Sequence, residues 1–323
     1  MTTNENQAAP TTEIRGIVAG VDGSDSALHA VMWAAREAQS RGVPLTVVNA
    51  LHLAEAAVAP LEPDDFAERQ QRAGTELVEA VATGLRNEYP ELTVETRISP
   101  SSPTAMLVEL STPEVLVVTG TRGHGGFAGM LLGSVSRALA THANGPLVVV
   151  RGPEPEQASG PVVLGVGLAP AESAVEFAFA TAQRYGAPLH VVRAWTPPVP
   201  MAGLGLPGGA ALGLGGPGIM SVPETFDSDA EETEHATRAI EPVRARYPDV
   251  KVEVSATMDN AVPALTGPGA HARLIVVGAR RHHGPFSVGA GYVVEGLLSH
   301  SPVPVAVIPV QPGEDGADGR LEG

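Results

Sequence analysis

Short apolar runs alternate with longer amphipathic segments along the whole chain. The apolar runs are rich in Val, Ile and Leu and contain few polar positions, which is typical of parallel strands covered on both faces. In the first half they predict strands near 15–22, 44–50, 92–98, 114–120 and 146–151. The segments between them predict helices over 25–41, 65–88, 102–110 and 133–143. This alternation of strand and helix is typical of an open, doubly wound α/β sheet.

The second half of the chain repeats the first. The sequence GIVAGVDGS at 16–24 corresponds to PVVLGVGLA at 161–169, and VLVVTGTRGHGG from Val115 corresponds to LIVVGARRHHG from Leu274. A period of roughly 150 residues is too long for a solenoid repeat and indicates duplication of a whole domain. We therefore expect two tandem flavodoxin-like (HUP-type) domains, 13–152 and 160–310, each with a five-stranded parallel sheet of order 3-2-1-4-5.

The charge balance of the chain argues against several classes of partner. With 36 acidic and 20 basic residues the formal net charge is −16, whereas nucleic acids and anionic membranes attract basic surfaces. No apolar run reaches the ~20 residues that cross a bilayer, and the polar segment 1–12 lacks a signal-peptide pattern. The chain has no cysteine, so disulfides and thiol chemistry are excluded. We expect a cytoplasmic protein that binds neither nucleic acid nor membrane.

A glycine-rich loop carries the strongest chemical signal in the sequence. It runs from Gly120 to Ser134, between the apolar run 115–119 and a predicted helix. Glycines let successive N–H groups turn toward one anion, and the start of a helix adds a partial positive charge. The loop therefore predicts a phosphate site. Lys251 is the only lysine and lies far along the chain from this loop, so a Walker-type P-loop is excluded.

The loop resembles that of the ATP-binding universal stress proteins. Its glycines and Ser134 fill the family spacing G-x2-G-x9-G-[ST], and the segment 20–26, GVDGSDS, resembles the opening strand of the family. The resemblance covers the chain from about Ile14 to Val310 and implies a tandem-domain member that binds ATP. It also implies that the final strands, Leu147–Arg151 and Val303–Val310, pair either within one chain or in a homodimer.

The resemblance implies that eight residues bind the nucleotide, from the adenine pocket to the phosphate tail. They are Asp22 for the nucleoside, Ala50 for adenine, Gly120, Arg122 and Gly123 for ribose and phosphates, and Gly133, Ser134 and Val135 for the phosphate tail. The residues by themselves leave alternatives open. Asp22 could instead cap the helix that begins near Ser24, and Arg122 could pair with a surface carboxylate. The carboxylates of Asp22 and Asp25 could also hold Mg²⁺ on bound phosphates.

The second half departs from the pattern at several of these positions. Gly167 stands in place of Asp22, and, when Gly278 is aligned with Gly120, Tyr292 stands in place of Ser134. Arg281 replaces Gly123, although Gly291 matches Gly133. We therefore expect the second domain to have lost ATP binding. The run 280–283, Arg-Arg-His-His, would then be a solvated loop or a pocket for a different anion.

An uncharged insertion distinguishes the second half further. Residues 197–223 contain eight Gly and six Pro together with several Leu, which disfavours a long helix or a central strand. The segment is either a flexible surface loop or a surface for a protein partner. The acidic tail 311–323 and the N-terminal 1–12 are expected to be disordered.

The sequence leaves three functions open. The first is a nucleotide-dependent sensor or regulator in a stress response, which changes its shape or its partners when ATP is bound. The second is an enzyme with slow ATP hydrolysis or with adenylyl or phosphoryl transfer, although the sequence contains no recognised catalytic motif. The third is a scaffold in which the nucleotide is structural and 197–223 contacts the partner.

Overall fold

The computed structural model describes residues 13–51, 63–123, 131–152, 160–196, 229–280 and 291–310, with the backbone alone at 63–66. The predictions for both chain ends, for the insertion 197–223 and for Arg281, His282 and His283 concern residues outside these ranges.

Strands and helices alternate through both halves, as the hydrophobic pattern predicts. The first half contains β1 (Gly16–Gly20), α1 (Asp25–Arg41), β2 (Leu45–Ala50), α2 (Pro63–Glu88), β3 (Val94–Ser99), α3 (Pro103–Leu110), β4 (Val115–Gly120), α4 (Ser134–His142) and β5 (Leu147–Val150). The second half contains β6 (Val162–Gly165), α5 (Glu172–Tyr185), β7 (Leu189–Trp195), α6 (Asp229–Arg244), β8 (Val252–Met258), α7 (Ala261–Gly269), β9 (Leu274–Ala279), α8 (Tyr292–His300) and β10 (Val305–Pro309). The α/β fold class is therefore confirmed.

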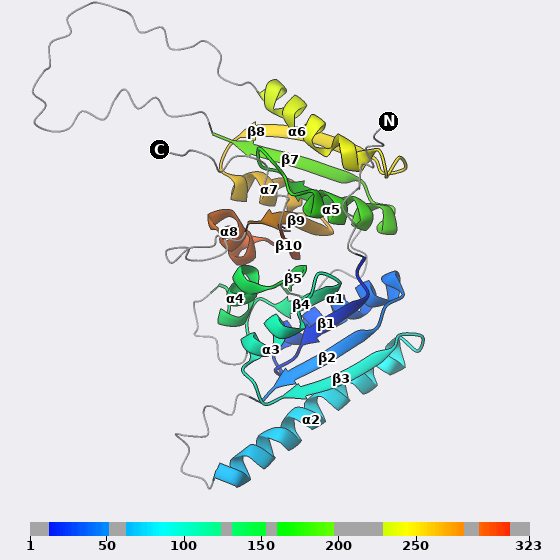
Figure 1. Cartoon of the computed structure of the whole chain (residues 1–323), viewed down its shortest axis with the longest axis vertical. Helices are drawn as coiled ribbons and strands as arrows, with labels where there is room; N and C mark the ends of the chain where they lie inside the picture. The colour runs from blue at the N-terminus through cyan, green and yellow to red at the C-terminus, as the bar shows by residue number, and fades with distance from the viewer. Residues whose placement is uncertain are drawn as a thin grey trace, which may run out of the picture.

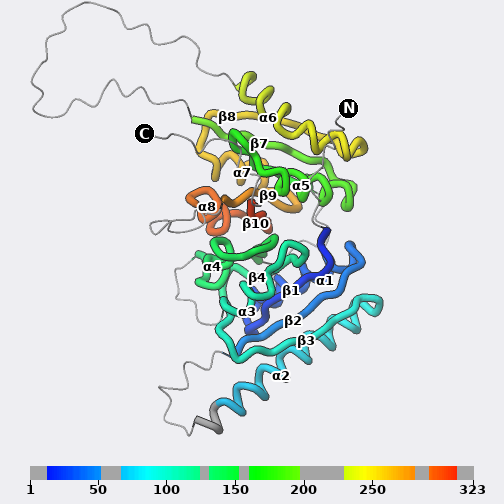
Figure 2. Tube along the Cα trace, in the orientation of Figure 1, coloured from blue at the N-terminus to red at the C-terminus, as the bar shows by residue number. Residues whose placement is uncertain are grey.

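The ten strands form one continuous sheet in the order β3-β2-β1-β4-β5-β10-β9-β6-β7-β8. Neighbouring strands are parallel within each half, and the order in each half is 3-2-1-4-5. The halves meet where β5 and β10 pair antiparallel, with Val149 opposite Val305 and Leu147 opposite Val307. The last strands thus pair within the chain, and the sheet runs through the length of the molecule (Figures 1 and 2).

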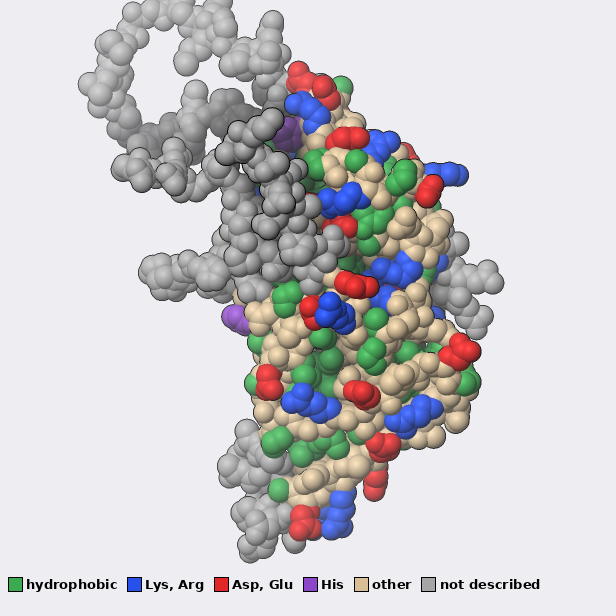
Figure 3. Space-filling view, turned by 45° about the vertical axis from the view of Figure 1, so that its right-hand side comes forward, with side chains coloured by type: hydrophobic (Ala, Val, Ile, Leu, Met, Phe, Trp, Pro, Cys, Tyr) green, Lys and Arg blue, Asp and Glu red, His purple; other side chains and the backbone are tan. Residues whose placement is uncertain are grey.

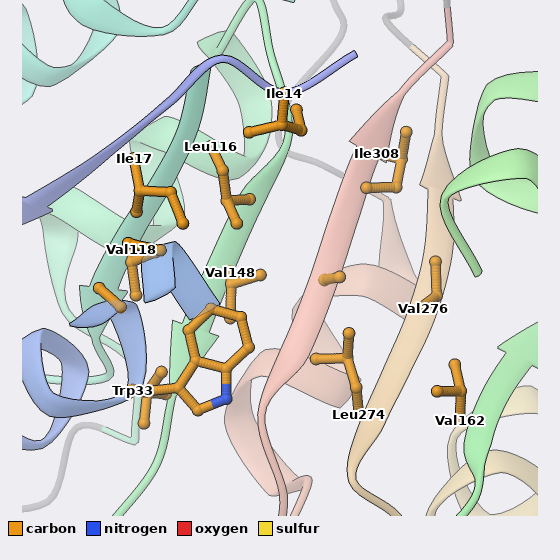
Figure 4. Packing of buried hydrophobic residues seen from close by; sticks show 14 of the residues in the cluster. Ile14, Ile17, Trp33, Leu116, Val118, Val148, Val162, Leu274, Val276 and Ile308 are labelled. Atoms are coloured by element: carbon orange, nitrogen blue, oxygen red, sulfur yellow. The ribbon is translucent and has the colours of Figure 1, made fainter. Parts of the chain in front are cut away.

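Two apolar layers cover the sheet, one on each face, and both extend across the junction of the halves. One layer contains residues of α1, α2, α5 and α6, and the other contains residues of α3, α4, α7 and α8. The strands at the junction alternate between the layers: Val148 and Val150 of β5 face the first, whereas Leu147 and Val149 face the second. Figure 4 shows Trp33 of α1 beside Val148 in the first layer. Burial of this layer therefore depends on both halves.

A buried ionic cluster also joins the halves, through helices α1 and α5. The carboxylate of Glu37, a residue that is only 1% exposed, accepts hydrogen bonds from Arg41 Nε at 2.6 Å and from Arg184 Nη1 at 3.0 Å. It also accepts a hydrogen bond from the hydroxyl of Tyr185. Burial and the charge of Arg41 lower the pKa of Arg184. Glu37 therefore neutralises guanidinium groups from both halves of the chain.

We expect Glu37→Gln to lower the free energy of unfolding by about 3 kcal/mol, because buried guanidinium groups would lose their counter-charge. Urea unfolding followed by circular dichroism measures this change. The matched control is Glu114→Gln, which breaks an exposed ion pair with Arg15 and should cost under about 1 kcal/mol. Equal effects of the two substitutions would contradict a structural role for the buried cluster.

The Tyr185 hydroxyl should make the fold sensitive to alkali. Burial and the nearby Glu37 carboxylate raise the pKa of Tyr185, whereas a tyrosine in the unfolded chain titrates near 10. The folded chain then keeps a proton that the unfolded chain releases, so stability is full below about pH 10 and falls as the pH rises further. Urea midpoints between pH 8 and 11 should fall less steeply in Tyr185→Phe than in the wild type. Tyr292→Phe, at an exposed position, should leave the pH dependence unchanged.

Candidate functional site

The eight sequence-predicted residues gather along the carboxyl edge of the first-half sheet. Strand β1 is hydrogen-bonded to both β2 and β4, so the ends of these three strands are adjacent. Asp22 follows β1, Ala50 ends β2, Gly120 ends β4, Arg122 and Gly123 follow β4, and Gly133, Ser134 and Val135 form the start of α4. Residues 113 positions apart in sequence, such as Asp22 and Val135, thereby belong to one edge. Ligands of doubly wound sheets bind at such an edge.

Asp22 forms a tight turn between β1 and α1. Its Oδ1 accepts hydrogen bonds from the Ser24 amide at 3.0 Å and from the Ser24 hydroxyl at 2.7 Å. Gly23 has φ +84°, a conformation that residues other than glycine rarely adopt. Ser24 is the N-cap of α1, since its hydroxyl accepts from the amide of Ala27. The alternative in which Asp22 itself caps α1 is therefore wrong, and Asp22 instead orients the residue that does.

Glycine is required for close packing at the end of β4. A Cβ on Gly120 would lie 2.4 Å from Ser26 Oγ and 2.5 Å from the Ser26 carbonyl oxygen. A Cβ on Gly123 would lie 2.4 Å from Asp22 Oδ2. The amide of Arg122 donates to Ser26 Oγ at 3.4 Å, which ties this loop to α1. The loop after β4 thus lies directly against the turn after β1, and its contact with Asp22 is one that the sequence spacing alone does not show.

The glycine-rich loop is closed at its base, where α4 begins. The amide of Gly133 donates to the Thr121 carbonyl at 2.7 Å, so the two ends of the loop meet. Gly133 is the N-cap of α4 and supplies no side-chain acceptor, whereas Ser24 and Ser102 cap α1 and α3 with their hydroxyls. The first-turn N–H groups of α4 therefore lack the side-chain cap that satisfies those other helices. Such a helix start favours an anion.

Two residues that were not predicted from the sequence also support the site. The Ser136 hydroxyl donates to the Gly120 carbonyl at 2.7 Å and lies 3.2 Å from Thr119 Oγ1, which pins the first turn of α4 to the end of β4. Buried Asn49 donates to the Val21 carbonyl at 2.7 Å and so joins the ends of β1 and β2 beside Ala50. Asn49 could have been found from the sequence, because a polar residue is unusual within an apolar strand. Ser136 gave no such indication, because serines are common near helix starts.

The corresponding edge of the second half is occupied by contacts within the chain. Arg280, which corresponds to Arg122, donates to the Ala169 carbonyl at 3.1 Å in the loop after β6. His235 of α6 lies 3.0 Å from the Leu168 carbonyl of the same loop. In place of Asn49, β7 carries Arg193, which forms a buried ion pair with Glu232. Tyr292, in place of Ser134, is 77% exposed. The halves share a fold but differ at this edge.

The described residues lack two further features. They contain no group of three His, Asp or Glu side chains arranged to hold a metal ion. None of the helices within the described ranges is long and apolar enough to span a membrane. Figure 3 shows acidic and basic side chains interspersed over the described part of the face in view, without a broad basic patch.

The fold and this edge define a duplicated, doubly wound α/β protein with a glycine-rich loop in its first half. A model of the universal stress protein family matches residues 13–151 and 159–309. The chain belongs to that family. Universal stress protein Rv2005c of Mycobacterium tuberculosis is 32% identical over 306 residues, covering 90% of this chain and 96% of the relative. Universal stress protein Rv1996 of the same organism is 33% identical over 322 residues, covering 92% and 96%.

A solved structure supports the tandem fold. The crystal structure of a universal stress protein from Archaeoglobus fulgidus superposes with a TM-score of 0.68 at 17% identity. The match covers 92% of this chain and 99% of the other. At this identity the comparison bears on the fold alone.

The close contact at Gly120 should make its replacement costly. Gly120→Ala would press a methyl group on the Ser26 backbone, and we expect a loss of about 1–3 kcal/mol in unfolding free energy. Gly84→Ala is the matched control, because Gly84 lies inside α2 with no atom within 4 Å of an added Cβ. That substitution should stabilise by about 0.5–1 kcal/mol. Thermal and urea unfolding of both variants tests the pair, and a neutral Gly120→Ala would refute the packing argument.

Proposed function

We propose that the first half of this universal stress protein binds an adenine nucleotide, ATP in the first instance, and that the protein acts as a nucleotide-dependent regulator in a stress response. The observation that carries the proposal is the contact between the Asp22 turn and the glycine loop beside the uncapped start of α4. This arrangement brings a carboxylate acceptor and several backbone donors to one edge of the sheet. A nucleotide requires both, because its ribose hydroxyls donate hydrogen bonds and its phosphates accept them.

Each of the eight residues would then have a defined task. Gly120, Gly123 and Gly133 let the loop backbone pack against neighbouring segments without a clash. Other N–H groups of the loop would then bind phosphate oxygens. Ser134 and Val135 would donate their amides at the start of α4, and the exposed Ser134 hydroxyl would add a further donor. Asp22 would accept from the nucleoside, and Ala50 would leave room for the adenine ring. Arg122 would neutralise phosphate charge.

We further propose that Mg²⁺ accompanies the phosphates at the same edge. The Asp22 carboxylate lies beside the loop, and Mg²⁺ usually binds one or two carboxylates together with phosphate oxygens. The ion would neutralise charge on the phosphate tail. Asp22, with Asp25 nearby in sequence, would be its protein ligand.

The second half would serve a different purpose. Its edge uses Arg280 for a carbonyl of its own loop and carries exposed Tyr292 where the first half has Ser134. We therefore propose a stoichiometry of one nucleotide per chain. Occupancy of the first half would influence the second at the junction of β5 and β10, and the insertion 197–223 would be a surface for a protein partner.

Nucleotide content and affinity test the proposal directly. Protein purified without added nucleotide is denatured, and the released compounds are identified by mass spectrometry. Isothermal titration with ATP and Mg²⁺ then gives affinity and stoichiometry. We expect one adenine nucleotide per chain, and at least about tenfold weaker binding in Gly123→Glu and Ser134→Tyr, because a carboxylate or a phenol would occupy the phosphate region.

Tyr292→Ser is the matched control, because it makes the reverse exchange at the corresponding position of the second half. It should leave affinity and stoichiometry unchanged. Two nucleotides per chain would show that the second half also binds. No binding of any adenine nucleotide would end the proposal, and ATP turnover well above the solution rate would favour the slow ATPase instead.

A further inference from the structure

Arg151 lies at the point where the proposed nucleotide edge meets the second half. It directly follows β5, and Val150 pairs with Gly120 at the end of β4, so Arg151 lies level with the start of the glycine loop. The same strand pairs with β10 on its other side. The connection from α8 to β10 therefore reaches the same edge, because β10 runs antiparallel to β5.

The guanidinium of Arg151 donates hydrogen bonds both to the segment before α4 and to helix α8. Its Nη2 donates to the Leu131 carbonyl at 3.2 Å, two residues before the N-cap of α4. The same nitrogen donates to the carbonyls of Leu298 at 3.1 Å and Ser299 at 2.8 Å in the last turn of α8. The carbonyls at the end of a helix attract a cation. These contacts fix the guanidinium beside the loop, although no carboxylate among the described residues is within ion-pair distance of it.

The Arg151 side chain has one N–H group without a partner among the described residues, and a second positive charge acts on it. Its Nε is buried and has no hydrogen-bond partner within the described part of the chain. Burial and the positive charge of Arg122 lower the pKa of Arg151. An anion with more than one negative charge, bound near both arginines, would offset their like charge.

The second half lacks this feature. Gly278, which corresponds to Gly120, pairs with Ile308, and the next residue is Pro309 rather than an arginine. The arginine after the last strand therefore occurs in the half that has the complete glycine pattern. Both halves share the sheet, so the presence of this arginine follows the glycine loop and not the sheet.

We propose that Arg151 is a second cationic ligand of the phosphate tail, acting with Arg122, and that it makes the site selective for adenine nucleotides with two or three phosphates over AMP and cyclic AMP. This inference rests on the proposed nucleotide function. It assigns the choice among nucleotides, which the backbone donors of the loop leave open, to the charge at the end of β5.

Affinities of the full-length chain for ATP, ADP, AMP and cyclic AMP, measured by isothermal titration, test the assignment. We expect Arg151→Gln to weaken ATP and ADP binding by about 10-fold or more and AMP binding by less than about 3-fold. Arg151→Lys keeps the charge and should retain most of the preference for ATP over AMP. Arg15→Gln is the control for net charge, because Arg15 precedes β1 at the opposite edge of the sheet, and its affinities should equal those of the wild type.

Salt dependence separates a phosphate contact from loop anchoring. A direct charge interaction is screened, so the ATP advantage of the wild type over Arg151→Gln should shrink between 0.05 and 1 M NaCl. An advantage that does not change with salt, or an equal loss of ATP and AMP affinity, would overturn the inference in favour of a structural role. Thermal unfolding identifies a variant that fails to fold, in which case the wild-type preference and Arg151→Lys decide.

The two proposals fail in distinguishable ways. If the wild type binds no adenine nucleotide, the proposed function fails and takes this inference with it. If the wild type binds ATP and AMP equally, or Arg151→Gln keeps the wild-type preference, only the role of Arg151 fails.

Discussion

The antiparallel pairing of β5 with β10 is the constraint on which the molecule depends. Both strands are buried along their whole length, so neither could leave its N–H and C=O groups unpaired without a large cost in free energy. Pairing them satisfies these groups and also merges the apolar layers of the halves. The Glu37 cluster adds buried ionic contacts between α1 and α5 across the same junction.

The same pairing determines what the first-half edge can influence. Strand β5 has β4 on one side and β10 on the other, so its end lies between the start of the glycine loop and the second half. Arg151 occupies that position. A change at the loop can therefore reach α8 through one side chain, without passing through the core. A rigid sheet alone would transmit such a change poorly, because packed cores deform little.

Divergence between the halves is concentrated at the sheet edge. The strands retain interchangeable Val, Ile and Leu residues, because a core requires volume and hydrophobicity more than particular side chains. The edge is less tolerant. Replacing Asn49 by Arg193 brings a buried charge that needs Glu232, and replacing Ser134 by Tyr292 adds a bulky exposed ring. Duplication thus preserved one fold twice, while only the first half retains the full glycine pattern.

The fold class, the repeat and the helices and strands of the first half could be predicted from the amino-acid pattern. The observed ends of those elements differ from the predicted ones by no more than two residues. Prediction was possible because apolar periodicity and glycine positions are local properties of the chain. The edge residues could be predicted too, since the glycine spacing is a family pattern. Three features could be seen only in the folded chain: the last strands pair within one chain, Asp22 lies against Gly123, and Glu37 and Arg151 join the halves. The strand pairing places Leu147 opposite Val307, 160 positions further along the chain, and a separation of that size leaves no periodic trace in the sequence.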